Sequence, residues 1–285
     1  ELAGMSSRTV RAAAQAPGSL DATELSSIDV NPADSTATAL LVALGDAVGK
    51  VFPPELERWG VSARDKLSPK SGHPLRAVAE RVAAVFGVEG FDLYVHRAKS
   101  GAVQLELTDP VSVLVPANVA GLPEPGIVFA MARAFAGIAR GLAAVDRLNA
   151  DELRKLLGAA ARGADSSFGA GTPDEDEMAS LQRRVAKAMP WLGRGAIEDA
   201  ARAYANAPVR DIGEWRLSAL MTSTRAAAIV CDDIVSAADF VRRTEGDLSS
   251  AKGDALLAGR RVVGDMLGFW VSDGAFAMKR RLGMG

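Results

Sequence analysis

The spacing of apolar residues divides this chain into a helical start, a strand-rich stretch and a long helical remainder. Apolar residues recur every three or four positions over about 35–51 and 73–87, which predicts two helices. Three short segments follow, FDLYVHR, AVQLELT and VSVLVP, in which Val, Leu and aromatic residues partly alternate with polar ones. Turn residues separate these segments, so residues 91–116 are expected to form three strands.

From Pro123 onward the pattern is helical. The first helix of this part, about 125–146, places its large apolar side chains on one stripe: Val128, Met131, Phe135, Ile138, Leu142 and Val145. We expect it to pack on the sheet through Met131, Phe135 and Ile138, because a sheet must bury at least one face. Further helices are predicted within 149–163, 173–191, 195–208, 213–231, 235–246 and 254–283.

Strands that are segregated from helices along the chain predict an α+β fold. The fold is expected to be mostly α-helical, with a small three-stranded sheet packed on a helix and followed by a helical bundle. Residues 1–33 are rich in Ala, Ser and Asp and are expected to form a linker or a packed arm. Residues 34–285 are long enough for a single domain with its own core. Because the sequence begins with Glu1, we expect a fragment that lacks a signal or an upstream domain.

Composition narrows the classes of partner. The formal net charge is −2, from 33 basic and 35 acidic residues, which gives no electrostatic case for binding nucleic acid or an anionic membrane. No apolar run approaches the ~20 residues of a spanning helix, so membrane insertion is not expected. The one cysteine, Cys231, ends an apolar helical run and is interpreted as a small buried side chain. We expect a cytoplasmic protein.

Common catalytic and cofactor motifs are absent from the sequence. It contains no phosphate-binding glycine loop and no GxSxG, and we therefore expect no cofactor. Four consecutive acids, Asp174 to Glu177, suit a helix N-terminus better than a calcium loop, which needs alternating acids. The two histidines, His73 and His96, are interpreted as solvent-exposed or locally hydrogen-bonded residues.

The order of elements resembles the gluzincin family of zinc peptidases. PVSVLVPANVAGL followed by GIVFAMARAFAGIARG is similar to that family's strand, loop and HExxH helix. ALMTSTRAAAIVCDDIVSAADFV is similar to its glutamate-ligand helix. The resemblance covers about 75–245 and extends to bacterial domains that follow tetratricopeptide arrays and keep this layout without the metal motif.

The chain departs from the family at every position that the chemistry needs. In the alignment that the resemblance implies, Arg133 and Gly137 replace the two histidines and Ala134 replaces the general base. Leu220 replaces the glutamate ligand, and Thr224 replaces the Asp after it. Zinc catalysis requires neutral imidazoles, a carboxylate ligand and a base for the bound water.

The resemblance therefore implies a catalytically degenerate, non-enzymatic domain that acts in protein–protein interaction or scaffolding. Two alternatives stay open. The chain could be a hydrolase that uses scattered carboxylates, which would require a large polar cleft with several ionisable groups. It could also be a purely structural module of a longer chain.

Two groups of residues are candidates for binding a protein partner. Arg133, Arg140 and Arg147 recur every seven residues, away from the apolar stripe, and are expected to form a solvated face or a ladder for an acidic partner. The C-terminal Trp270, Arg280 and Arg281 combine an aromatic anchor with a basic rim, although docking of a last helix on the core explains the same residues. Small residues such as Ala134 and Gly137 are expected to let a neighbouring helix close the former cleft.

We predict that the purified protein carries no stoichiometric zinc, because Arg133, Gly137 and Leu220 occupy the positions of the implied ligands. Elemental analysis measures this directly. A value close to one tightly held zinc per chain would contradict the prediction.

Overall fold

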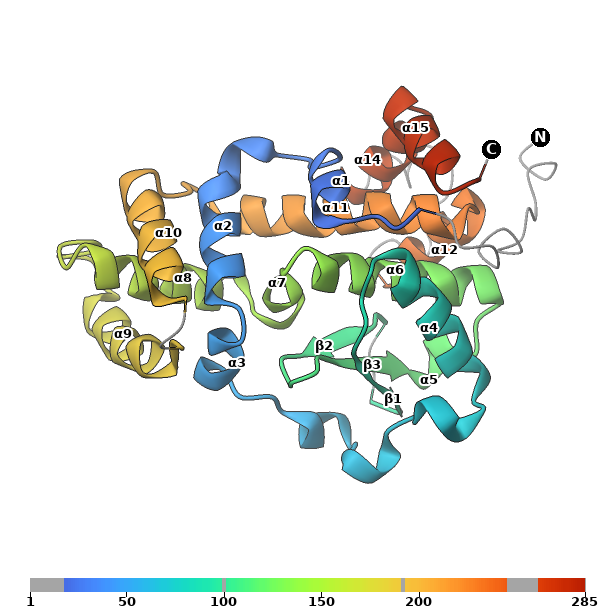
Figure 1. The fold of residues 1–285 in the computed structure, drawn as a ribbon, viewed down its shortest axis with the longest axis horizontal. Helices are drawn as coiled ribbons and strands as arrows, with labels where there is room; N and C mark the ends of the chain where they lie inside the picture. The colour runs from blue at the N-terminus through green and yellow to red at the C-terminus, as the bar shows by residue number, and fades with distance from the viewer. Residues whose placement is uncertain (1–17, 99–100, 191–192, 245–260, 285) are drawn as a thin grey trace.

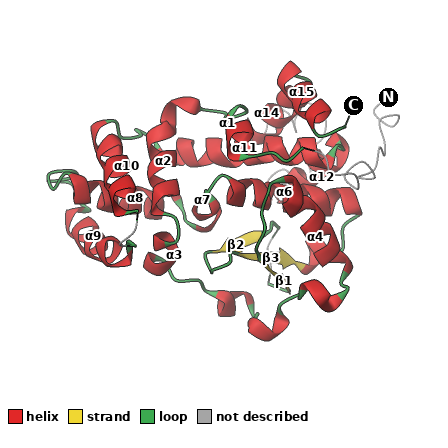
Figure 2. Ribbon diagram, viewed as in Figure 1, coloured by secondary structure: helices red, strands yellow, loops and turns green. Residues whose placement is uncertain are grey.

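Helices make up most of the molecule, and one small sheet lies among them (Figure 1, Figure 2). The computed structural model describes residues 18–98, 101–190, 193–244 and 261–284. The element order agrees with the sequence pattern: helices, then three strands, then helices to the end. The predicted α+β fold of mostly helical character is thus confirmed.

The sheet contains the three predicted strands. They are β1 (Asp92–His96), β2 (Gln104–Glu106) and β3 (Ser112–Pro116), in the order β1-β3-β2. β3 lies in the centre, parallel to β1 with Leu93 opposite Val113, and antiparallel to β2. Every residue of β3 is buried, as the continuous apolar run of a central strand requires.

Both faces of the sheet are covered. Leu93, Leu105 and Val113 belong to the larger of two main hydrophobic cores. Tyr94 and Leu114 point to the opposite face and pack with residues of the segment 56–72. Taken alone, its sequence, LERWGVSARDKLSPKSG, indicates a surface connection, whereas the structure packs part of its apolar side chains on the sheet. Its apolar residues follow no helical or strand period, so the sequence pattern did not show that they bury a sheet face.

The segment 56–72 contains three short 3-10 helices: η4 (Leu56–Trp59), η5 (Ala63–Asp65) and η6 (Pro69–Ser71). Leu56, Trp59 and Val61 supply its contacts with the sheet. The backbone N–H of Leu67 also donates to the carbonyl of Leu93 on β1, at 2.7 Å. Both contacts tie the segment to the sheet.

The larger core surrounds the sheet. Its helices are α1 (Ala22–Ser26), α4 (Pro74–Val85), α5 (Ala117–Ala120), α6 (Glu124–Ala139), α12 (Ile234–Thr244), α14 (Arg261–Trp270) and α15 (Asp273–Arg281). Helix α6 lies against the sheet core, with the Phe135 ring 4.7 Å from that of Phe91, directly before β1. Met131 and Phe135 are completely buried, and Ile138 is partly buried against the same core.

A second core lies beside the first and is entirely helical. It is formed by α2 (Ser35–Leu44), which η3 (Pro32–Asp34) precedes, together with α3 (Ala47–Val51), α7 (Ala143–Arg147), α8 (Ala150–Ala164), α9 (Glu175–Ala188) and α10 (Arg194–Asn206). Asn149 caps α8 in a capping box with Glu152. The acidic run begins α9, as predicted, and Asp174 and Glu177 pair with basic residues of α8.

One helix connects the two cores. Helix α11 (Ile212–Cys231) begins with Trp215 and Ala219 in the second core and ends with Ala226 to Cys231 in the first. Figure 1 shows it running along the top of α6 and on toward α10. Within the described residues, no helix combines the length and the apolar character that crossing a membrane requires.

Two predicted helices are each divided by a glycine. The helix expected over 35–51 breaks at Gly45, and the helix expected over 125–146 breaks at Gly141. Both glycines have a positive φ, +45° and +69°, which departs from the right-handed helical conformation and so ends the helix. Glycine suits these positions because other residues rarely adopt a positive φ. The apolar stripe continues across Gly141, so its periodicity concealed the break.

Residues 18–33 pack on the helices and are not extended, while 1–17 lie outside the described residues. Leu20, Leu25 and Ile28 are buried in the larger core. The Asp29 carboxylate pairs with Arg140 at 2.5 Å, and Arg225 donates to the Ile28 carbonyl at 2.9 Å. This segment is therefore held by side chains from the C-cap of α6 and from α11.

Glu106, at the end of β2, is a buried carboxylate with three donors. Its side chain is 1% exposed. It accepts hydrogen bonds from Arg147 Nε at 2.9 Å, Trp59 Nε1 at 3.0 Å and the Glu55 backbone N–H at 3.1 Å. The network joins the sheet, α7 and the segment that covers the sheet's second face.

We predict that Glu106→Ala lowers the free energy of unfolding by about 3–5 kcal/mol, because it leaves the buried guanidinium of Arg147 without its main partner. Urea unfolding measures the loss. The matched control is Asp199→Ala, whose exposed carboxylate pairs with the exposed Arg202, and it should cost less than about 1 kcal/mol. Equal losses in the two variants would contradict the role given to Glu106.

Candidate functional site

Three of the positions that the peptidase resemblance singled out meet at one cavity. Arg133 and Ala134 of α6 and Leu220 of α11 line a cavity of about 210 Å³. Two further charged residues line it, Asp146 of α7 and Arg216 of α11. We call it the arginine–aspartate cavity; its remaining lining residues are Ala102, Val103, Gln104, Leu105, Ala130 and Phe240.

Gly137 lies beside this cavity and contacts Asp146. A Cβ atom at Gly137 would lie 3.2 Å from Asp146 Oδ2, closer than most real Cβ contacts. The absence of a side chain therefore lets the carboxylate approach the α6 backbone where the resemblance implies a histidine. Thr224 is buried and donates to the Leu220 carbonyl at 2.9 Å, and it does not line the cavity.

The three charged groups of the cavity influence one another. Burial raises the pKa of the Asp146 carboxyl, while the nearby charges of Arg133 and Arg216 lower it in part. Burial lowers the pKa of the Arg216 guanidinium, and Asp146 opposes that shift. Arg216 Nε is fixed by the carbonyls of Val145 and Leu148, each at 3.0 Å. The group is thus positioned by α7 as well as by its own helix.

Arg133 is less constrained than Arg216. It is half-buried, and its Nε is completely buried without a hydrogen-bond partner among the described residues. A buried donor that lacks an acceptor is uncommon and costs stability. Arg133, which lines the cavity, therefore retains hydrogen-bonding capacity that the described part of the chain does not satisfy.

The cavity corrects one expectation and bears on metal binding. The cleft was expected to be closed by packing, but a space of about 210 Å³ remains, and Asp146, Arg133 and Arg216 line it. Its charged groups are two guanidiniums and one carboxylate, which suit an anion better than Zn²⁺. Within the described residues, no group of three or more His, Cys, Asp or Glu side chains is arranged to hold a metal.

The expected exposed row of arginines is not present. The side chain of Arg140 is 7% exposed, pairs with Asp29 and donates to the Ala219 carbonyl at 3.0 Å. Arg147 is mostly buried and pairs with Glu106. The seven-residue repeat does not describe a single face, because α6 ends before Arg140 and Arg147 lies on α7. Of the three, Arg133 alone lines the cavity.

The C-terminal candidates separate into packed and exposed residues. Trp270 packs on the larger core, and the Lys279 ammonium lies 3.0 Å from its ring centroid. Arg281 is exposed and pairs with Glu24, whereas Arg280 is exposed on α15. Phe276, one helical turn before Arg280, is 52% exposed. The last helices therefore dock on the core and leave a small apolar and basic surface outward.

The histidines and the cysteine take structural positions. His73 caps α4 by accepting from the Leu75 N–H at 3.2 Å, as expected. Cys231 is buried, as expected, and burial raises the pKa of its thiol to about 12. His96 differs from its interpretation: it is 2% exposed, and neither ring nitrogen has a partner within the described ranges. Its ring centroid lies 5.1 Å from that of Trp59.

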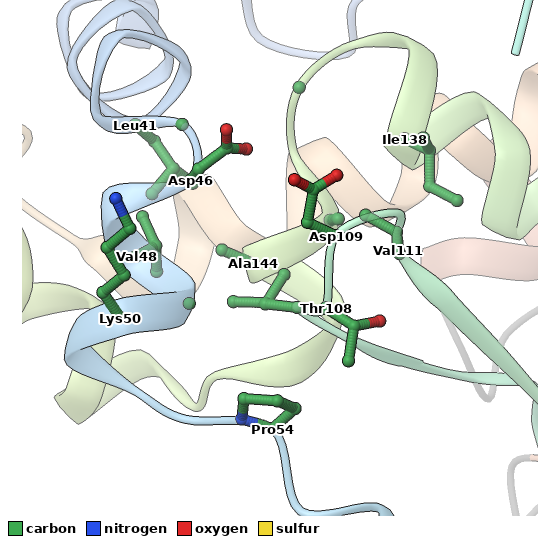
Figure 3. A pocket seen from close by; sticks show the side chains of 15 residues that line it. Leu41, Asp46, Val48, Lys50, Pro54, Thr108, Asp109, Val111, Ile138 and Ala144 are labelled. Carbon is green, nitrogen blue, oxygen red and sulfur yellow. The ribbon is translucent and has the colours of Figure 1, made fainter. Parts of the chain in front are cut away.

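A larger pocket of about 630 Å³ lies where the two cores meet. Its lining is mainly apolar, from Leu41 and Val48 on one side and Leu107, Val111 and Ile138 on the other. Figure 3 shows the charged side chains Asp46, Lys50 and Asp109 around these apolar groups. The pocket has the size of a ligand site. Its three charged side chains are exposed to solvent, so none of them is a buried charged group that could select a ligand.

Sequence reasoning missed Asp146 and Arg216. Arg216 precedes Leu220 by one helical turn, a spacing that could have placed it on the same face as the suspected ligand position. No local signal identifies Asp146, because the break at Gly141 redirects its helix. Spacing along the helix could therefore have placed Arg216 beside Leu220, whereas only the three-dimensional path of the chain places Asp146 at the cavity.

We predict that His96 makes the protein acid-sensitive. Burial lowers the pKa of its imidazole, so the unfolded chain, with a pKa of about 6.5, takes up the proton first as the pH falls. Stability from the neutral ring is thus present above about pH 6.5 and is lost below it.

The measurement is the free energy of unfolding of wild type and of His96→Phe, which retains an aromatic ring, between pH 7.5 and 5.5. Both proteins keep Asp29 and Asp146, so the difference reports on the imidazole. The free energy of unfolding of His96→Phe should rise relative to that of wild type as the pH falls. A difference that does not change with pH would refute the assignment.

Comparison with known proteins adds no family to this description. No family model matches the chain, and neither a curated protein nor a solved structure matches it.

Proposed function

We propose that this protein is a non-catalytic, zinc-peptidase-like domain that binds another protein or serves as a scaffold. The observation that carries the proposal is the composition of the arginine–aspartate cavity. Arg133 and Leu220 line the cavity at two of the implied ligand positions, and the Asp146 carboxylate lies next to the third, Gly137. The proposal also places the protein in the cytoplasm, where a single buried cysteine such as Cys231 needs no partner.

Electrostatics favours binding over metal-dependent hydrolysis. Arg133 and Arg216 are guanidiniums, which cannot act as metal ligands and repel a divalent cation. The one carboxylate of the cavity already interacts with both of them. Ala134 offers no group to take a proton from water. A cavity with this charge supports recognition of an anionic group and not activation of water by zinc.

A surface for a protein partner is available on α15. Phe276 and Arg280 lie one turn apart on the same helix face and are both exposed, and Val271, before the helix, is 70% exposed. We call these three residues the α15 patch. An exposed aromatic side chain next to an arginine is typical of residues that anchor protein interfaces.

One observation favours the alternative of an enzyme. Asp146 has a raised pKa and lies in a cavity with two arginines, and perturbed carboxyl groups of this kind often act as general acids or bases. The cavity of about 210 Å³ is smaller than the ligand sites of most enzymes. The remaining alternative, a structural module, requires neither the cavity nor the patch.

We predict that wild type does not hydrolyse a fluorogenic peptide library, with or without added Zn²⁺. The triple variant Arg133→His, Ala134→Glu and Gly137→His should also be inactive, because Leu220 still offers no third ligand and the Asp146 carboxylate meets the imidazole introduced in place of Gly137. Hydrolysis by wild type that is lost in Asp146→Asn would contradict the binding proposal and support the enzyme alternative.

The binding part of the proposal predicts that Phe276→Ser with Arg280→Glu reduces recovery of a protein partner in a pull-down at least several-fold. The melting temperature should change little, because exposed substitutions usually shift stability by less than about 0.5 kcal/mol. Arg202→Glu, an exposed change on α10, is the control and should keep the partner. Loss of the partner in both variants would mean that general charge, and not the α15 patch, determines recovery.

A further inference from the structure

The arginine–aspartate cavity has the features of a ligand site that its own side chains do not fill. Its volume of about 210 Å³ exceeds the ~150 Å³ of an engineered cavity that accepts benzene. Arg133 lines it, and the Nε atom of Arg133 is buried without an acceptor among the residues that the structure describes. Leu220 and Phe240 add an apolar wall, and residues 102–105, which include the start of β2, form another side.

The charges of the cavity define the ligand it can take. Arg133 and Arg216 contribute two positive charges and Asp146 one negative charge, which leaves one net positive charge in the cavity. A monoanion would neutralise that charge, whereas a dianion such as phosphate would leave an excess negative charge at low dielectric. Guanidinium groups bind carboxylates through paired hydrogen bonds.

We propose that the arginine–aspartate cavity binds a single carboxylate group with a short apolar substituent, held by Arg133 and Arg216, with the substituent against Leu220 and Phe240. This inference rests on the proposed non-catalytic function, since it makes the cavity a recognition site. The carboxylate belongs either to a free small acid or to the C-terminus of a peptide. Both present the same chemistry to the two arginines.

Asp146 sets the strength of binding. The titratable groups that face it are Arg133 from α6 and Arg216 from α11, while β2 contributes Gln104 and α12 contributes Phe240. The ionised Asp146 carboxylate repels an incoming carboxylate, and its protonation removes that repulsion. Affinity should therefore rise as the pH falls, for as long as the ligand itself stays ionised.

The test measures the binding of propionate to the whole protein by isothermal titration at constant ionic strength, with propionamide as the uncharged control of equal shape. Propionate should bind, and propionamide should bind at least about tenfold more weakly, because a charge-assisted hydrogen bond contributes about 1.5–3 kcal/mol. A parallel arm compares an acetylated tripeptide that has a free C-terminal carboxylate with the same peptide as its C-terminal amide. Carboxylate-dependent binding in either arm supports the proposal and identifies the source.

Variants separate the cavity from general surface charge. Arg133→Gln should weaken binding about tenfold or more, while Asp146→Asn should strengthen it several-fold and remove its pH dependence. Leu220→Phe keeps all three charges but fills the cavity, and it should abolish binding. The control Arg202→Gln, on the exposed face of α10, should have no effect.

Several results would overturn the inference. They are the absence of carboxylate-dependent binding in both arms, tighter binding of phosphate than of propionate, or equal weakening by Arg202→Gln and Arg133→Gln. Loss of fold in Arg133→Gln would be seen by circular dichroism, and the comparison then rests on Asp146→Asn and Leu220→Phe. The peptide-hydrolysis assay is independent of these titrations, so failure of the carboxylate site and failure of the non-catalytic proposal give different results.

Discussion

The packing of α6 against α11 is the contact on which the other elements depend. Residues 128–132 of α6 are completely or almost completely buried, and so are Ala226 to Ile229 of α11. A helix segment that is buried on all sides must carry apolar or small side chains around its circumference, as residues 128–132 and 226–229 do. The sheet, α4 and α12 pack on α6, while α14 and the arm at residues 18–33 pack on α11. Of this pair, α6 belongs to the larger core, and α11 extends from the larger core into the second.

Arginine side chains fasten segments of the chain to one another. Arg140 binds Asp29, Arg225 binds Asp265 through two hydrogen bonds, and Arg147 binds Glu106. Each pair joins residues that lie 40 or more positions apart in the chain. Guanidinium groups suit this role because their planar donors can satisfy a carboxylate and a backbone carbonyl together. Buried pairs of this kind fix how segments are arranged more than they add net stability.

The same residue type that fixes the fold also defines the cavity. Arg133 and Arg216 lie on the two central helices, and the carboxylate near them, Asp146, interacts with both, but Arg133 Nε has no acceptor among the described residues. On α6, that carboxylate lies next to Gly137. Helices α6, α7 and α11 thus line a polar space. The proposed role in binding depends on this space.

The sequence by itself determined the fold class, the three strands, the small buried Cys231 and the start of α9 at the acidic run, since apolar periodicity and capping residues act over a few neighbouring positions. The sequence also shows that no HExxH motif is present, because neither His73 nor His96 has a second histidine four residues away. Tertiary structure decided which arginines are buried, that residues 56–72 cover a sheet face, and that Asp146 enters the cavity. Those outcomes depend on the turn of the chain at Gly141 and on partners distant in sequence, such as Asp29 for Arg140. Local spacing carries no information about such partners, because the path of the chain between them sets their distance.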